Sequence, residues 1–201
     1  PHLDPEIRQI TLDAVHVIES LGATIEEVSI PLMRDSGLIN GALGAPRAAL
    51  HWRHLNETPS DYDKGVRRYT LLPALIPAVI YQRALQLRSL LRAQILDATQ
   101  QMDVLITPAY PDFPPRIEDT KEPPRSKEHA VQQMRRFSFA TAANYAGLPA
   151  MSVPAGFSRS GLPIGLQLMG KRFDEESVLR LGHAFEIATV WHTMRPPFGA
   201  D

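Results

Sequence analysis

The residues of this sequence that could take part in a reaction are a few histidines and serines. His51 and His54 are three residues apart and could share a helix face, as metal ligands do, but no third ligand stands at a typical spacing. His183 and Glu186 have the same separation, at which a carboxylate could orient a general base. Both pairs are more commonly part of a solvated helix surface. Neither pair therefore predicts a site, and we expect no metal.

The serines and glycines also fail to complete a catalytic or phosphate-binding motif. A triad hydrolase holds its nucleophile in Gly-x-Ser-x-Gly, and neither Ser152 nor Ser158 has glycine at both flanking positions. Residues 165–171 are similar to the start of a phosphate-binding loop, but Arg172 stands where Ser or Thr would meet Mg²⁺. We therefore expect no nucleotide and no other cofactor.

Composition narrows the class of protein further. The 201 residues are 44% hydrophobic and 21% charged, which is typical of a globular domain with its own core. A net charge of -1 makes nucleic acid and anionic membranes improbable partners. Cysteine is absent, which fits a reducing compartment such as the cytoplasm. The longest apolar run, residues 71–80, is interrupted by two prolines and is shorter than the ~18 residues of a membrane span.

Hydrophobic periodicity and turn residues predict a single α/β unit that positions these residues. We expect helices over residues 5–21, 38–55, 78–99 and 128–146 and another beginning after Asp174, with strands over residues 24–30, 104–107, 150–153 and 164–169. The last two strands should form a hairpin. Residues 56–64 and the proline-rich residues 110–127 are expected to be loops, and the tail after Arg195 irregular. The long helix 78–99 has more than one apolar stripe, so it should be well covered.

The start of the sequence lacks a methionine and a signal-peptide pattern. The first helix also has no strand before it to complete a crossover. We therefore expect the chain to begin inside a longer fold.

Three segments in a fixed order carry the most information: DVLITP at residues 103–108, NYAGLPAMSVPAG at residues 144–156 and GLPIGLQLMG at residues 161–170. Taken one at a time, their glycines and prolines only indicate turns and strand ends. Together they resemble the amidase-signature family, and the similarity extends back to residues 3–6 and 21–23, over nearly the whole chain.

This resemblance implies that residues 1–201 are the C-terminal portion of one amidase-signature domain, an α/β fold with helices around a mixed central sheet. It also implies amide hydrolysis by a Ser, cis-Ser, Lys triad with oxyanion donors from a glycine-rich loop. In the family the triad lies upstream, and no Gly-Gly-Ser-Ser-Gly-type run occurs here. We therefore expect no catalytic residue in this chain, which would supply scaffold and a pocket wall and need the upstream half as its partner. Association of the chain with copies of itself, as a homo-oligomer, is a further possible partnership.

The pocket candidates come from the same resemblance. Arg68 matches an arginine that holds free glutamine in the related tRNA amidotransferase subunits, but the acidic position of those subunits falls here on Phe137. Phenylalanine cannot accept hydrogen bonds from an ammonium group, which favours a general amidase with a less polar substrate. Tyr110, after a strand end, and Asn144, in the second segment, complete the set. The alternatives are a non-catalytic subunit or binding module on the same scaffold, and a glutamine-using tRNA amidotransferase subunit.

Overall fold

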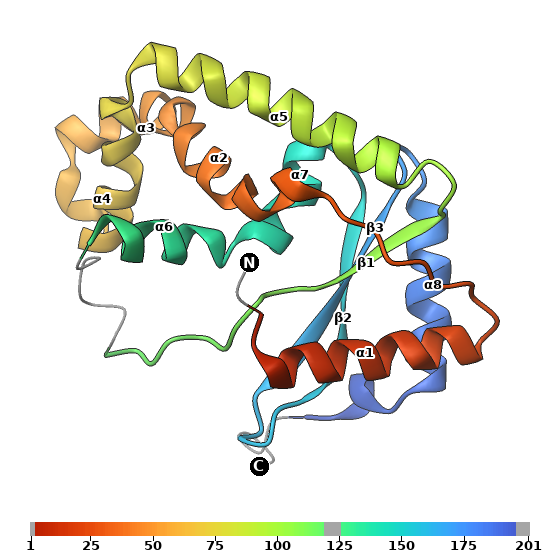
Figure 1. Cartoon of the computed structure of the whole chain (residues 1–201). Helices are drawn as coiled ribbons and strands as arrows, with labels where there is room; N and C mark the ends of the chain where they lie inside the picture. The colour runs from red at the N-terminus through yellow and green to blue at the C-terminus, as the bar shows by residue number, and fades with distance from the viewer. Residues whose placement is uncertain (1–2, 119–125, 196–201) are drawn as a thin grey trace.

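A computed structural model describes residues 3–118 and 126–195, with helices arranged around a small sheet (Figure 1). The helices are α1 (Pro5–Ser20), α2 (Ser36–Ala42), α3 (Ala45–Glu57), α4 (Lys64–Leu71), α5 (Ala78–Ala98), α6 (Lys127–Arg135), α7 (Ser138–Ala146) and α8 (Glu175–Ala188). The strands are β1 (Val104–Pro108), β2 (Ala150–Phe157) and β3 (Pro163–Gly170). The short 3-10 helices are η1 (Pro31–Asp35), η2 (Pro59–Asp61), η3 (Leu72–Leu75) and η5 (Trp191–Thr193).

The three strands form an antiparallel sheet in the order β1, β3, β2. Val104 of β1 lies opposite Gly170 of β3, and Ala150 of β2 lies opposite Met169. A bulge interrupts the pairing between Pro154 and Gly156. The middle strand is therefore the last of the three in the sequence, and within the described residues β1 pairs along only one of its edges.

Alternation along the strands sends side chains into two separate apolar clusters. On one face, Leu105 and Met169 join buried residues of α5 and α7. On the other face, Leu166 and Leu168 pack with residues of α1 and α8. The sheet is thus a middle layer, with α1 and α8 on one side and α5 and α7 on the other (Figure 1).

Several sequence predictions are confirmed. The Asp4 carboxylate accepts hydrogen bonds from the backbone of the first turn of α1, and Gly22 after its end has a φ of 98°. Helix α7 ends at Gly147, whose φ of 66° is left-handed. The hairpin of β2 and β3, strand β1 and the capping of α8 by Asp174 also appear as predicted.

The strand predicted over residues 24–30 is wrong. These residues have no regular secondary structure. Val28 and Ile30 still pack against the cluster that contains α5 and α7, so the segment buries its apolar side chains without joining a sheet. Just beyond it, the backbone N–H of Leu32 donates to the side chain of Gln94 on α5. The imperfect alternation of apolar and polar residues in this segment indicates buried side chains and not a strand.

The single helix predicted over residues 38–55 is two helices, α2 and α3, separated at Leu43 and Gly44. Pro46 has no N–H to continue a helical ladder and lies in the first turn of α3, where that N–H is not needed. A side chain at Gly44 would meet the ring of Pro73, at 2.8 Å from its added Cβ. The structure also adds α4, which begins after Asp63 at the end of the predicted loop 56–64, itself partly the η2 turn.

The helix predicted over residues 128–146 is likewise two helices, α6 and α7, with a turn at Arg136 and Phe137. Buried hydroxyl groups fix the second of them. Ser36 donates to the carbonyl oxygen of Ser138 at 2.6 Å, and the Ser138 hydroxyl donates to the carbonyl oxygen of Arg34 at 2.5 Å. These long-range bonds set the direction of α7 independently of α6.

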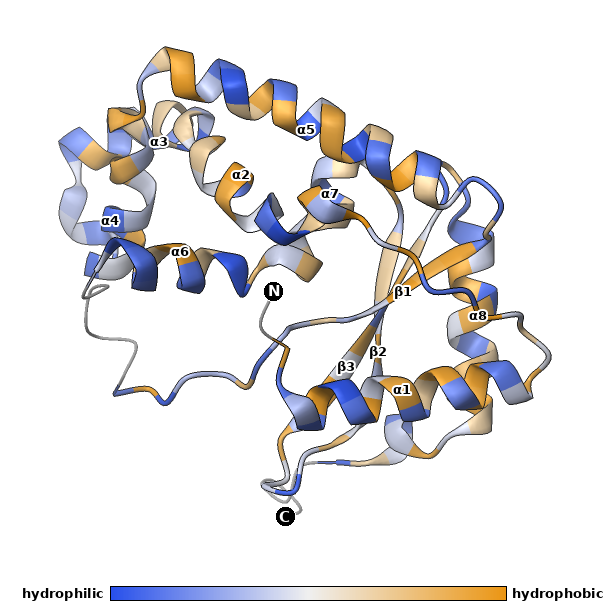
Figure 2. Cartoon of the chain, in the orientation of Figure 1, coloured by the Kyte–Doolittle hydropathy of each residue, from blue (hydrophilic) through white to orange (hydrophobic). Residues whose placement is uncertain are grey.

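Helix α5 has the predicted length but not the predicted coverage. Only Ala84, Leu91 and Ile95 are buried, whereas apolar side chains on its other faces, including Val79 and Leu90, are exposed. Figure 2 shows hydrophobic residues recurring along its whole length. Among the described helices, none has the length and hydropathy needed to cross a membrane. Residues 119–125 of the predicted excursion and the tail after Arg195 lie outside the described residues.

Candidate functional site

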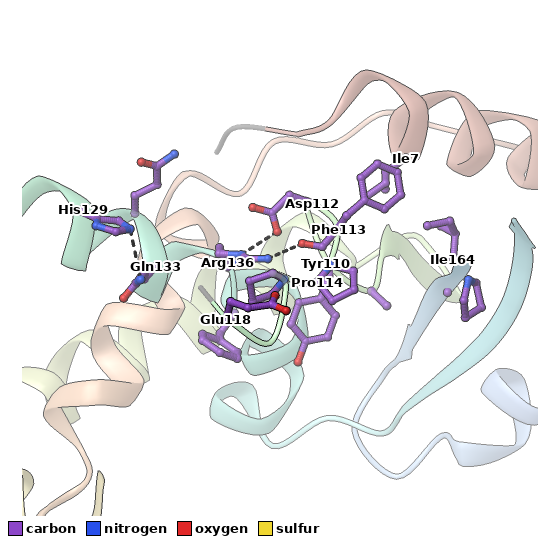
Figure 3. Close-up of a pocket in the computed structure, with 16 residues that line it drawn as sticks. Ile7, Tyr110, Asp112, Phe113, Pro114, Glu118, His129, Gln133, Arg136 and Ile164 are labelled. Atoms are coloured by element: carbon purple, nitrogen blue, oxygen red, sulfur yellow. Dashed lines mark hydrogen bonds and ion pairs between the residues drawn. The ribbon is translucent and has the colours of Figure 1, made fainter. Parts of the chain in front are cut away.

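An open cleft of about 940 Å³ lies between the proline-rich segment after β1 and the turn that joins α6 to α7 (Figure 3). The start of α1 and the start of β3 close its other side. Its lining residues are Ile7, Ala109, Tyr110, Asp112, Phe113, Pro114, Pro115, Glu118, His129, Gln132, Gln133, Arg136, Phe137, Pro163, Ile164 and Gly165.

Backbone hydrogen bonds hold the proline-rich segment in place where no regular element forms. The N–H of Ala109 donates to the carbonyl oxygen of Gly165 at 2.9 Å, which extends the pairing of β1 with β3 by one residue. The N–H of Asp4 donates to the carbonyl oxygen of Pro111 at 2.8 Å. Prolines in the segment lack the N–H that a helix or strand would use, so these two anchors set its path.

Arg136 ties this segment to the opposite wall. Its Nε lies 2.7 Å from Oδ1 of Asp112, and its Nη2 donates to the carbonyl oxygen of Phe113 at 2.5 Å. Figure 3 shows the guanidinium between these two acceptors. Because Asp112 already neutralises it, Arg136 holds the cleft together and is not an unpaired cation for an anionic ligand.

Two aromatic rings meet edge to face on the wall of the cleft. The centroids of Tyr110 and Phe137 are 6.0 Å apart, and their planes make an angle of 76°. Their side chains are 45% and 49% exposed, so much of each ring is open to solvent although the two rings touch. An aromatic or aliphatic group of a ligand could cover the two rings. The binding free energy gained in this way grows with the apolar area removed from water.

Polar side chains of α6 line the far end of the cleft. Nε2 of Gln133 lies 3.2 Å from Nε2 of His129, and Gln132 lies close by on the same helix. Glu118 contributes a carboxylate from the proline-rich segment. These groups can donate and accept hydrogen bonds at the polar end of a ligand. The cleft therefore has an apolar part and a polar part, which is the usual composition of a small-molecule site.

The structure brings together only two of the four pocket candidates. Tyr110 and Phe137 lie in contact on the cleft. Arg68 is exposed on α4 and Asn144 is exposed on α7, where its Nδ2 donates to the carbonyl oxygen of Ala140 at 3.3 Å. Arg68 and Asn144 are therefore not part of the cleft lining, and their role in substrate binding stays a prediction.

Sequence reasoning missed Arg136 and the residues of α6. Arg136 pairs with Asp112 across 24 residues of sequence, a distance at which no local spacing rule applies. Its position directly before Phe137 was the one available signal, because neighbours of a pocket residue often support it.

Most of the other residues considered in the sequence as catalytic, metal-binding or phosphate-binding candidates lie in ordinary helices and strands. His51 contacts the hydroxyl of Tyr62 through Nδ1 at 3.0 Å, and residues 165–171 fall mostly in β3. Ser152 lies in β2 opposite Gln167, while His183 lies on α8. Within residues 3–118 and 126–195, no group of three or more His, Asp or Glu side chains is placed to hold a metal ion.

A second and larger hollow, of about 1260 Å³, runs along the open edge of β1. Residues 21–31 and side chains of α1 and α8 form its walls. Its lining is more apolar than polar, and it includes charged side chains such as Arg8, Glu26 and Arg180.

Residues 1–179 match the family model named Amidase. The chain is similar to a glutamyl-tRNA(Gln) amidotransferase subunit of Halalkalibacterium halodurans, with 33% identity over 95% of this chain and 43% of that protein. It is also similar to an amidase of Pseudomonas putida, with 32% identity over 96% of this chain and 42% of that protein. The chain thus spans less than half the length of either relative.

Solved structures share the fold. A bacterial aryl acylamidase of the amidase signature enzymes superposes with a TM-score of 0.80 at 21% identity, over 98% of this chain and 44% of that one. At this level of identity the similarity concerns the arrangement of helices and strands.

Proposed function

The chain belongs to the amidase family, and on that premise we propose that its cleft forms one wall of the binding pocket of an amide hydrolase that prefers apolar amides. The observation that carries this proposal is the half-exposed pair of Tyr110 and Phe137 on the cleft. An apolar acyl or aryl group would cover the rings, while the polar side chains of α6 would meet the amide end.

Nucleophile, base and oxyanion donors would come from outside these 201 residues. In the family that this chain resembles, a serine-rich run and a lysine supply these groups. No matching run occurs in this sequence. The chain would then supply positioning alone, and the upstream half of the enzyme would be its partner.

A glutamine-using amidotransferase subunit is the second candidate, because a relative with that name is 33% identical to this chain. Two observations favour the general amidase instead. The ammonium group of glutamine would need a hydrogen-bond acceptor at the position of Phe137, and phenylalanine supplies none. Arg68 does not line the cleft that Phe137 lines. A non-catalytic binding module would use the same cleft without any hydrolysis.

Ligand titration of the chain tests this proposal. We expect acetanilide to shift the NMR signals of residues around the cleft in a saturable way, with glutamine binding at least tenfold more weakly. The matched control is Phe173→Asp, which replaces an exposed phenylalanine away from the cleft. Acetanilide should bind this control like the unaltered chain. Equal binding of glutamine and acetanilide at the cleft would favour the amidotransferase instead, and the absence of binding by either would remove the cleft from consideration.

A further inference from the structure

The turn that carries Phe137 to the wall of the cleft packs against a helix that is not part of the cleft. Helix α2 contacts both α6 and α7, the two helices that this turn joins (Figure 1). Among the described residues that line the cleft, none comes from α2. The place of the Phe137 ring therefore depends on contacts between the turn and α2, outside the cleft itself.

Gly37, in the first turn of α2, brings the two backbones into direct contact. It is buried, and a Cβ added to it would lie 2.0 Å from the carbonyl oxygen of Met134 and 3.6 Å from the Cβ of Phe137. Only a residue without a side chain permits so close an approach. The same carbonyl oxygen accepts a hydrogen bond from the N–H of Phe137 at 3.2 Å. A shift of Met134 would therefore reach Phe137 through a single hydrogen bond.

Polar contacts of the two residues before this glycine hold the turn on both sides of Phe137. On one side, Nε and Nη2 of Arg135 lie 2.9 Å and 2.8 Å from Oδ1 of Asp35. On the other side, the fully buried hydroxyl of Ser36 donates to the carbonyl oxygen of Ser138 at 2.6 Å. A charge-assisted pair and a buried hydrogen bond both resist displacement. Residues 35–37 thus fix the turn against α2 at three points.

We propose that Gly37 is a positioning residue for the cleft: together with Asp35 and Ser36, it holds the turn close to α2 and so fixes the place of the Phe137 ring. The inference rests on the proposed function, in which that ring covers the apolar group of an amide. Closely packed backbones cannot absorb an added methyl group, so a side chain at residue 37 moves the turn. A helix outside the cleft thus helps to set the preference for apolar ligands.

Gly37→Ala tests this role, and Gly41→Ala is the matched control. The control adds the same methyl group to the same helix, where the Cβ would lie 3.5 Å from the flexible end of the Met134 side chain. Both variants gain helix propensity to the same extent, so that effect cancels. In the ligand-free chain, we expect NMR contacts between the Tyr110 and Phe137 rings to weaken in Gly37→Ala and to persist in Gly41→Ala. Contacts that persist in both folded variants would overturn the proposal.

Acetanilide binding separates this inference from the proposed function. The affinity should fall about tenfold in Gly37→Ala, because the displaced ring no longer covers the aromatic group of the ligand, and should change by less than about twofold in Gly41→Ala. If acetanilide does not bind even the unaltered chain, the proposed function fails, whereas the ring contact still decides the role of Gly37. A loss of stability in Gly37→Ala with ring contact and affinity unchanged would reduce Gly37 to a packing residue and overturn the proposal.

Asp35→Asn keeps the proposal testable if Gly37→Ala does not fold. The change removes the negative charge that Arg135 pairs with, so the contact between the Tyr110 and Phe137 rings should weaken. The matched control is Glu57→Gln, which removes the carboxylate of an exposed ion pair within α3. Ring contacts as strong in Asp35→Asn as in Glu57→Gln would show that residues 35–37 do not position the ring.

Discussion

Arg136 on the α6–α7 turn and Asp112 in the proline-rich segment form an ion pair of 2.7 Å that joins the two walls of the cleft. Within the described residues, no helix or strand hydrogen bonds connect these walls. The pair, with the bond from Arg136 to the Phe113 carbonyl oxygen, is therefore the main polar link that keeps Tyr110 against Phe137.

Replacing Arg136 by Met should loosen that link. We expect the Tyr110 to Phe137 contact to weaken and the free energy of unfolding to fall by about 1–3 kcal/mol, since a charge-assisted hydrogen bond is lost and a carboxylate is left unpaired. Ring-to-ring NMR contacts and urea unfolding measure both effects. Arg172→Met, outside the cleft, serves as control. Ring contacts that persist in Arg136→Met would mean that backbone anchors alone position the segment.

Phe137→Asp should reverse the preference for apolar substrates. In a full-length enzyme that carries these residues, kcat/KM for an aromatic or aliphatic amide should fall about tenfold, which corresponds to about 1.4 kcal/mol of transition-state stabilisation. The ratio of kcat/KM between an apolar amide and glutamine is the quantity to compare. If that ratio does not change, Phe137 does not contact the substrate.

The chain by itself should hydrolyse no amide above background. Loss of the nucleophile or base commonly removes ~10⁴ to 10⁶ in rate, and loss of oxyanion donors ~10² to 10³ more. The assay compares turnover of a chromogenic anilide and short aliphatic amides by the chain alone and after co-refolding with the upstream half of the enzyme. Steady turnover by the chain alone, abolished by Ser152→Ala or His183→Ala, would sink this prediction.

Self-association of the isolated chain is expected from its exposed apolar surface. Leu75 in η3 is 79% exposed, and Val79 in the first turn of α5 is 59% exposed. Within the described residues, β1 also has an open edge beside a large hollow. Surfaces of both kinds promote association. Sedimentation should show dimers or larger species that bind a dye specific for apolar surface. A monodisperse monomer without dye binding is the contrary outcome.

Ser36→Ala tests the buried hydroxyl network that sets the direction of α7. The change removes the donor to the Ser138 carbonyl oxygen and the contact with the Thr141 hydroxyl at 2.9 Å, so we expect a loss of about 1–3 kcal/mol in the free energy of unfolding. Ser20→Ala is the control, because its hydroxyl bonds locally at an exposed helix end. Equal losses in the two variants would assign the effect to helix propensity.

Local signals in the sequence predicted the elements whose ends are marked by capping residues and turns. Asp4 and Gly22 bound α1, and Gly147 ends α7, because each acts within a few residues of itself. The break at Arg136 was missed because packing against distant residues decides it, as Ser138 bonding to Arg34 illustrates. The break at Gly44 had a local signal in Pro46, which lies in the first turn of α3. A helix pattern alone does not reveal where tertiary contacts redirect it.

The candidate site was predictable to the same extent. A family resemblance located Phe137, and a strand end pointed to Tyr110, both of which line the cleft. Arg68 came from the same resemblance but lies elsewhere, since resemblance in sequence order does not fix where an exposed side chain of a separate helix is placed. Arg136 required the fold itself.

The order of strands has a consequence for how the chain acquires its shape. Strand β3 lies between β1 and β2 but follows both in the sequence, so β1 has no neighbour in this sheet until residues 163–170 have left the ribosome. Contacts of such high sequence separation slow folding, because a long loop must close before they form. Until then β1 and the apolar faces beside it are without β3, its partner among the described residues, and unpaired strand edges of this kind are prone to aggregate.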